Sequence, residues 1–282
     1  MKLLQKTNYT FLLLLLLTAC DNKQGTPQQT EKDTISHTGT QPVDTVKQRY
    51  NLLISNIPIP FEILQRLSNS YVAYKPAFMN PVNSISRYNQ SNSKSLNLGV
   101  YGADLTYVIS MGEFKEFASY IRTIKKLADE LGVPTAFDEK TMDRYDQNKN
   151  NKDTIENIMY HSYNEIDRSL KSEDRIGMAA LVVSGGWIES LYLTTQTIGT
   201  NDNNGSYTEL YNMLQEQKKH LTNLINLLSD FKTEPFQSIV ADLIKIRKLY
   251  TSAADANHLS QEEVRSISEE VLRLRTKITN GS

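Results

Sequence analysis

An almost uncharged stretch from Ile176 to Thr195, IGMAALVVSGGWIESLYLTT, most constrains how this chain can fold. Its single acidic or basic residue is Glu189. A helix that is apolar nearly all round belongs at the centre of a domain, where other helices cover it. A second stretch of this kind, LNLGVYGADLTYVISM, has Asp104 as its lone acid. The sequence therefore predicts two apolar helices at the centre of the fold.

Each of these two predicted helices contains a pair of glycines close to its acid. A glycine inside a helix costs about 1 kcal/mol relative to alanine, so this recurrence indicates close contact between two helix backbones. The similarity leaves two explanations open: a diverged duplication, or two paired helices that each need small residues. The glycines are Gly99, Gly102, Gly185 and Gly186.

The rest of the chain shows the spacing of amphipathic helices and no convincing run of alternating strand residues. Ser260 with Glu263 forms a capping box, and Asp153 with Glu156 resembles one. The segment 72–92 is predicted to be an irregular connection. We predict an all-α fold, a single bundle of about eight to ten helices with two central Gly-containing apolar helices. The other expected helices include 61–67, 113–131, 153–170, 207–231, 236–251 and 260–278.

The N-terminus has the features of a secretory signal. Two lysines precede an apolar block, Phe11 to Leu17, that is too short to span a membrane as a mature helix. The next residues complete the sequence LTAC, Leu17 to Cys20, which resembles the lipobox of bacterial lipoproteins. This resemblance implies cleavage before Cys20 and acylation of its thiol and of the new amino terminus. An ordinary signal peptide with an incidental cysteine is the alternative.

Cys20 is the only cysteine, which excludes an intramolecular disulfide and a thiolate metal cluster. Several acyl chains anchor a protein stably in a bilayer, since each buried CH₂ contributes about 0.8 kcal/mol. We therefore expect a protein of the bacterial cell envelope that is anchored to a membrane through lipidated Cys20. Asp21 resembles the inner-membrane retention signal of enterobacterial lipoproteins. That signal does not transfer safely to other bacterial groups, so an anchor in the inner membrane and one in the outer membrane both remain open.

The composition divides the chain into three parts: a signal peptide at 1–19, the lipidated cysteine with a flexible tether at 20–45, and a helical domain at 46–282. The tether is rich in Thr, Gln, Lys, Asp, Ser and Pro, a composition that cannot offset its own ordering entropy. The formal net charge is −1. A near-neutral chain lacks the basic surface of a nucleic-acid binder, so no nucleic-acid partner is expected.

The two isolated acids are the main candidates for a functional site. An ionised carboxylate in an apolar helix must be paired, hydrogen-bonded or protonated through a raised pKa. One hypothesis is that Asp104 and Glu189 converge to hold a cation or a small polar ligand. The alternative is that each acid pairs with an arginine or lysine of a neighbouring helix. The residues that could share such a site are Asn97, Tyr101, Tyr107 and Tyr192, of which the first two lie on the helix face of Asp104.

A second candidate site is the polar segment DQNKNNKD, which begins at Asp146. Its alternating acids and amides, Asp146, Asn148 and Asn150, resemble the start of an EF-hand calcium loop. The segment departs from that pattern at Asn151, where a glycine is expected, and at Asn157, where a bidentate glutamate is expected. An ordinary polar loop with a helix cap is the alternative.

Motifs of several enzyme classes are absent from the sequence. It contains no HExxH, no GxSxG, no GxxxxGK[ST] and no GxGxxG after a strand, so no cofactor is expected. The segments SLNLGVYGADLTY and GGWIESLYL look like those of uncharacterised helical lipoproteins of the Bacteroidetes group. This resemblance covers most of residues 46–230. It implies a lipoprotein with an all-α body and implies no activity.

These features predict a lipid-anchored envelope protein that binds or scaffolds, with an envelope protein or a small polar ligand as its partner. The alternative is an envelope enzyme that uses Asp104 and Glu189 for acid–base chemistry. Such an enzyme requires two carboxylates with separated pKa values in an accessible cleft. A cleft that exposes both acids favours the enzyme, whereas burial without an opening favours binding or structure.

Overall fold

The computed structural model describes residues 42–70, 72–149, 151–172, 175–199, 208–252 and 259–281. The predicted signal peptide, Cys20, Asn150 and most of the predicted tether lie outside these residues. The described residues form ten α-helices, three 3₁₀ helices and no strand, so the predicted all-α bundle is confirmed. The elements are α1 (Pro42–Ile54), α2 (Pro60–Asn69), η1 (Pro76–Phe78), η2 (Val82–Arg87), α3 (Ser91–Ser110), α4 (Phe117–Glu130), η3 (Pro134–Phe137), α5 (Glu139–Asn148), α6 (Lys152–Ser172), α7 (Ile176–Gly199), α8 (Thr208–Leu228), α9 (Phe236–Ser252) and α10 (Gln261–Thr279).

The centre of the bundle is the pair α3 and α7, which pack along each other more extensively than any other pair of elements. Their glycines lie at this contact. A Cβ atom on Gly99 would lie 2.0 Å from the carbonyl oxygen of Val182, and one on Gly185 would lie 1.9 Å from the carbonyl oxygen of Leu96. The predicted contact between two helix backbones is therefore confirmed, and only glycine permits it at these two positions.

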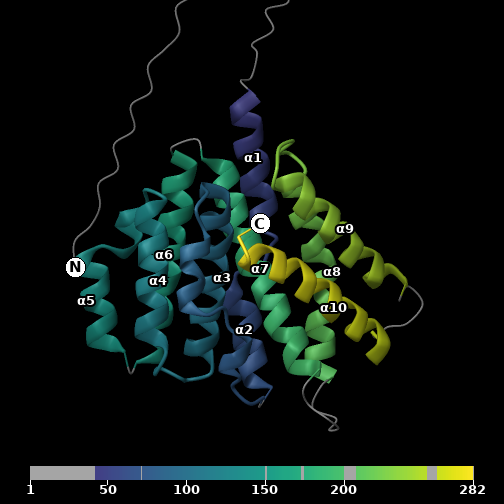
Figure 1. Cartoon of the computed structure of the whole chain (residues 1–282), viewed down its shortest axis with the longest axis horizontal. Coiled ribbons are helices and arrows are strands. Elements are labelled where there is room, and N and C mark those ends of the chain that lie inside the picture. Colours follow the sequence, from purple (N-terminus) through teal and green to yellow (C-terminus); the bar gives the residue numbers. More distant parts are fainter. Residues whose placement is uncertain are drawn as a thin grey trace, which may run out of the picture. The chain divides into compact units, whose positions relative to one another are not determined.

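The other helices cover this central pair on several sides (Figure 1). α2 and α4 pack on α3, and α6 contacts both central helices. α8 and α10 pack on α7, and α9 lies against both of them. Each covering helix turns one apolar face inward, as the sequence periodicity predicts. In α10 that face is formed by Val264, Ile267, Val271, Leu274 and Ile278.

By length and composition alone, α7 could cross a membrane. In the structure, 83% of its most apolar window is buried inside the bundle. The helices packed against it include α3, α10 and α8, which occupy the positions that lipid would have around a spanning helix. α7 is therefore the core helix of the domain, in agreement with the position expected for an uncharged helix.

The structure differs most from the predictions in three places. α1 begins at Pro42, inside the segment predicted as tether, and α4 begins at Phe117 instead of residue 113. The segment between the predicted helices 113–131 and 153–170 contains a helix that the sequence did not predict, α5, whose one buried side chain is Tyr145. An aspartate caps this helix: Asp138 accepts a hydrogen bond from the backbone N–H of Thr141 at 2.8 Å. A cap and a single anchoring tyrosine give too weak a periodic signal to indicate a helix.

The predicted capping box of α10 is confirmed. The Ser260 hydroxyl accepts a hydrogen bond from the Glu263 N–H at 3.2 Å, and the Glu263 carboxylate accepts one from the Ser260 N–H at 2.7 Å. The capping role predicted for Asp153 is wrong. α6 begins one residue earlier, and Asn151 accepts the capping bond from the Thr154 N–H at 3.1 Å.

We expect Ser260→Ala to lower the free energy of unfolding by about 1 kcal/mol, because it removes one half of the capping box. Ser266→Ala in the interior of the same helix is the matched control, and it should be neutral or slightly stabilising because alanine has the highest helix propensity. Urea denaturation followed by circular dichroism measures both variants. Equal effects of the two substitutions would show that the cap contributes nothing.

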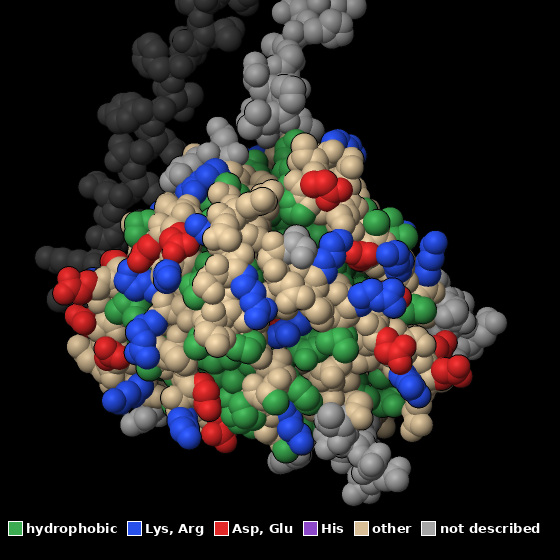
Figure 2. Space-filling view, viewed as in Figure 1, with side chains coloured by type: hydrophobic (Ala, Val, Ile, Leu, Met, Phe, Trp, Pro, Cys, Tyr) green, Lys and Arg blue, Asp and Glu red, His purple; other side chains and the backbone are tan. Residues whose placement is uncertain are grey.

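Charged side chains of both signs are interspersed over the face shown in Figure 2, with hydrophobic side chains visible between them. The described residues include exposed ion pairs, such as Arg66 with Glu209 and Glu216. Exposed pairs of this kind contribute up to about 1 kcal/mol each. This face therefore has a mixed electrostatic surface without a continuous field of one sign.

Candidate functional site

Asp104 of α3 and Glu189 of α7 both lie in the interior of the bundle, and each side chain is 0% exposed. They face each other closely enough for the charge of Glu189 to raise the pKa of Asp104. The packing of α3 against α7 thus brings together Asp104 and Glu189, each of which is the lone acid of an apolar helix segment. The first part of the sequence hypothesis, that Asp104 and Glu189 converge, is confirmed.

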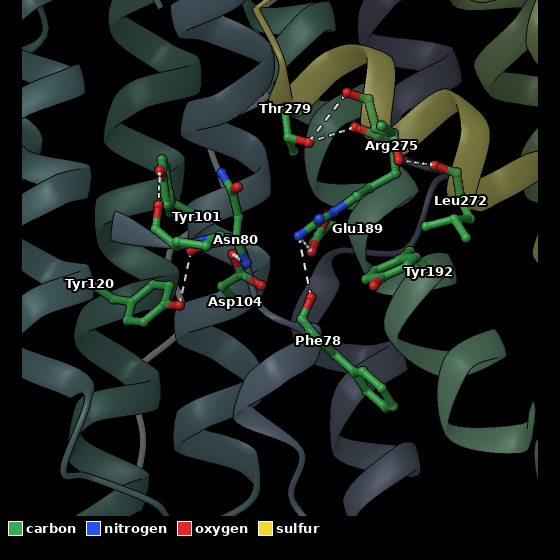
Figure 3. A network of polar contacts seen from close by, with 12 residues as sticks. Phe78, Asn80, Tyr101, Asp104, Tyr120, Glu189, Tyr192, Leu272, Arg275 and Thr279 are labelled. Atoms are coloured by element: carbon green, nitrogen blue, oxygen red, sulfur yellow. Dashed lines mark hydrogen bonds and ion pairs between the residues drawn. The ribbon is translucent and has the colours of Figure 1, made fainter. Parts of the chain in front are cut away.

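Arg275 of α10 pairs with Glu189 through two parallel bonds (Figure 3). Its Nε and Nη2 atoms each lie 3.0 Å from a carboxylate oxygen of Glu189. The guanidinium also lies over the ring of Tyr192, 4.6 Å from the ring centre. Burial alone lowers the pKa of Arg275, but the Glu189 carboxylate outweighs it and the pKa rises. The arginine therefore stays charged, and the alternative hypothesis, a basic partner from a neighbouring helix, is confirmed for Glu189.

Asp104 has a different environment. Its Oδ2 atom accepts a hydrogen bond from the Asn80 N–H at 3.0 Å, whereas its buried Oδ1 accepts none. Burial and then the charge of Glu189 raise the pKa of Asp104 well above its ordinary value, against the opposing effects of Arg275 and of the Asn80 N–H. Two adjacent buried carboxylates cannot both ionise beside a single arginine. The raised pKa favours the protonated form of Asp104, and a protonated carboxyl could donate a hydrogen bond to Glu189.

The irregular segment that contains η1 and η2 explains why so many polar side chains lie here. Several of its backbone groups lie where they are wholly or partly shielded from water, and side chains of α3, α4 and α10 form hydrogen bonds with them. Burial raises the pKa of Tyr101 and of Tyr120, which keeps both as hydroxyl donors. The bonds join Tyr107 Oη to the Lys75 N–H (3.0 Å), Arg275 to the Phe78 carbonyl (3.3 Å), Tyr120 to the Asn80 carbonyl (3.0 Å) and Tyr101 to the Pro81 carbonyl (2.9 Å).

Asn97, which the sequence placed in the same candidate site, has a separate role. Its amide donates to the Ser93 carbonyl at 2.9 Å and to the Ile278 carbonyl at 3.1 Å, so it joins α3 to the end of α10. Asp104, Glu189, Tyr101 and Tyr192 thus belong to one polar cluster, whereas Asn97 contacts α10 and Tyr107 contacts the start of the irregular segment.

Arg275, Asn80 and Tyr120 are the members of the cluster that sequence reasoning missed. For Arg275 a signal exists: it lies four residues after Val271 and three before Ile278, which places a charge on the buried face of α10. A charged residue at such a position needs a buried partner of opposite sign. Asn80 has no comparable signal, because it lies in an irregular segment without periodicity.

The charges of the central cluster balance. Glu189 is paired with Arg275, and the raised pKa of Asp104 favours its uncharged form. Both acids are fully enclosed, so neither meets the requirement of an accessible cleft for acid–base catalysis. The cluster can hold α3, α7, α10 and the irregular segment together. In this structure it cannot receive a substrate.

The raised pKa of Asp104 predicts that native stability decreases as the pH rises. In the unfolded chain an aspartate ionises near pH 3.9, whereas folded Asp104 keeps its proton to higher pH. Ionisation therefore favours the unfolded state across this interval, by up to about 1.4 kcal/mol per pH unit. Asp104→Asn removes the titration and keeps one donor and one acceptor. We expect its unfolding free energy, relative to the native chain, to increase as the pH rises above about 4. Urea titrations test this, and a difference that does not change with pH would contradict it.

The proposed calcium loop does not form between the predicted ligands. Asp146 and Asn148 lie in α5, which continues to Asn148, and α6 begins at Lys152, so too few residues remain between them for a twelve-residue EF-hand loop. The Asn148 amide donates to the Arg144 carbonyl at 2.8 Å within its own helix. The third candidate, Asn150, lies outside the described residues. Among the described side chains, no group of three or more His, Cys, Asp or Glu is placed to hold a metal ion.

Comparison of the chain with protein-family models, with curated protein sequences and with solved structures gave no match. The functional assignment therefore depends on the residues of this chain and on their arrangement in the described structure.

Proposed function

We propose that this protein is a lipid-anchored binding or scaffolding protein of the bacterial cell envelope. The lipobox-like sequence from Leu17 to Cys20 supports the anchor, because it follows a basic start and an apolar block. The polar residues after Cys20 would give the helical domain reach from the membrane surface. Partners of the domain are then other envelope proteins or a small ligand.

One observation favours binding over catalysis: Asp104 and Glu189, the two acids that the sequence offers for acid–base chemistry, have no exposed surface, and Glu189 is paired with Arg275. An enzyme that used them would have to open its own core to bind substrate. The energetic cost of exposing a buried ion pair and its apolar surroundings makes this a poor catalytic design. A binding protein has no such requirement, because its central cluster can be purely structural.

Metabolic labelling with a palmitate analogue in a bacterial host tests the anchor. We expect the full chain to incorporate the label and to sediment with membranes, and Cys20→Ala to lose the label and appear in the soluble fraction. Ser110→Ala, a substitution of similar size within the helical domain, serves as a control that should leave labelling unchanged. Membrane association of Cys20→Ala equal to that of the native chain would contradict the proposed lipid anchor.

A further inference from the structure

A pocket of about 400 Å³ opens between the start of α2, the second half of α3 and the first half of α6. Small-molecule sites in proteins have volumes of roughly 300–1,000 Å³, and most have largely apolar walls with a few polar groups. The wall here has the same character. Its apolar part includes Ile59 and Phe61 of the α2 entry, Ile109 of α3 and Met159 of α6.

Two large hydrophobic side chains remain exposed at this pocket. Ile59 is 37% exposed and Tyr160 is 52% exposed. Within the described residues, only Leu52 and Leu272 are comparable, and neither lines the pocket. Exposed hydrophobic side chains that gather at a concave surface mark a binding site more often than scattered ones do. The pocket thus offers an apolar cavity with an aromatic ring at its edge.

The polar part of the wall is negatively charged. Asp153 and Glu156 lie three residues apart on α6 and both line the pocket. Lys152 lies beside Glu156: its Nζ atom is 3.8 Å from Glu156 Oε1 but donates its hydrogen bond to the Ser110 carbonyl at 3.1 Å. Glu156 Oε1 therefore lacks a hydrogen-bond donor although it is buried. Two acids and one lysine leave this end of the pocket with a net negative charge.

We infer that this pocket binds a small amphipathic amine, with its apolar or aromatic body between α2, α3 and α6 and its ammonium group at Glu156 and Asp153. An ammonium group has the hydrogen-bond donors that Glu156 lacks, and its charge complements the two carboxylates. The ring of Tyr160 can contact the apolar body or the cation. This inference rests on the proposed binding role and names a ligand class for it.

Water-soluble probes of matched shape test the inference: 2-phenylethylamine, uncharged 2-phenylethanol and anionic 3-phenylpropionate. The protein is the full chain with Cys20→Ser, so that no acyl chain competes for the pocket and failure of the anchor proposal leaves this test intact. Saturation-transfer NMR measures binding of each probe. We expect the amine to bind at least about fivefold more tightly than the alcohol, and the anion to bind most weakly.

Two variants locate the site. Glu156→Gln should weaken amine binding about fivefold and leave binding of the alcohol unchanged, because it removes charge but little volume. Tyr160→Ala should weaken binding of both probes. The controls are Glu262→Gln, an exposed acid in the first turn of α10, and Leu272→Ala, an exposed apolar side chain of the same helix; neither should alter binding.

Three outcomes would overturn the inference. The first is no preference for the amine over the anion, and the second is full amine binding by Glu156→Gln. The third is a pair of results: the protein binds none of the probes, and Tyr160→Ala loses an envelope protein partner that the native chain binds. That pair would assign the pocket to a protein contact. Because all three are measured without acylation, they leave the test of the lipid anchor unaffected.

Discussion

Replacing Arg275 with methionine should lower the free energy of unfolding by about 3–5 kcal/mol, the range observed when one partner of a buried ion pair is removed. Glu189 is 0% exposed and receives two bonds of 3.0 Å from this arginine. Without Arg275, the carboxylate remains in the core with no compensating charge. The Phe78 carbonyl also loses its hydrogen bond from Arg275. Chemical denaturation at neutral pH, followed by circular dichroism, measures the loss.

The double variant Glu189→Met with Arg275→Met is the matched control. It removes both charges together, and buried ion pairs replaced by apolar residues are often neutral or more stable. We therefore expect it to recover most of the stability lost in Arg275→Met. The double variant also tests the prediction if Arg275→Met does not fold. A folded double variant would then show that the uncompensated charge of Glu189 prevented folding of the single variant. A double variant as unstable as the single one would show that the uncompensated charge of Glu189 is not the cause.

The second large effect is expected for Gly185→Ala, with a loss of at least about 3 kcal/mol. The new Cβ would lie 1.9 Å from the carbonyl oxygen of Leu96, an atom of the facing helix backbone that no side-chain rotation can move. α3 and α7 must therefore separate, which loosens the most extensive helix contact of the bundle. Thermal and urea unfolding of the variant measure this effect.

Gly199→Ala provides the comparison on the same helix. A Cβ at Gly199, the last residue of α7, meets no atom within 4 Å. Without a clash, alanine should be neutral or stabilise the helix by up to about 1 kcal/mol. The difference in stability between the two variants therefore measures the effect of the α3–α7 contact separately from the effect of helix propensity. Equal stability of Gly185→Ala and Gly199→Ala would show that α3 and α7 accommodate a methyl group at their contact.

The central helices could be predicted because their evidence is local. An uncharged stretch with glycines, such as Ile176 to Thr195, has one favourable position in a helical protein, at the centre beside another backbone. The same reasoning identified Asp104 and Glu189 as acids that require an explanation. The polar helix α5 could not be predicted in this way, because one buried tyrosine gives no periodic pattern.

The sequence by itself determined the all-α class, the two central helices and the need of two buried acids for partners, since each follows from composition or spacing within a short segment. Only the tertiary structure decided which partners they have. Arg275 reaches Glu189 from the last helix, and Asn80 reaches Asp104 from an irregular segment. Local spacing can place a charge such as Arg275 on a buried helix face, but its partner depends on how distant elements pack. The pocket between α2, α3 and α6 has the same origin, because three segments far apart in the chain form its wall.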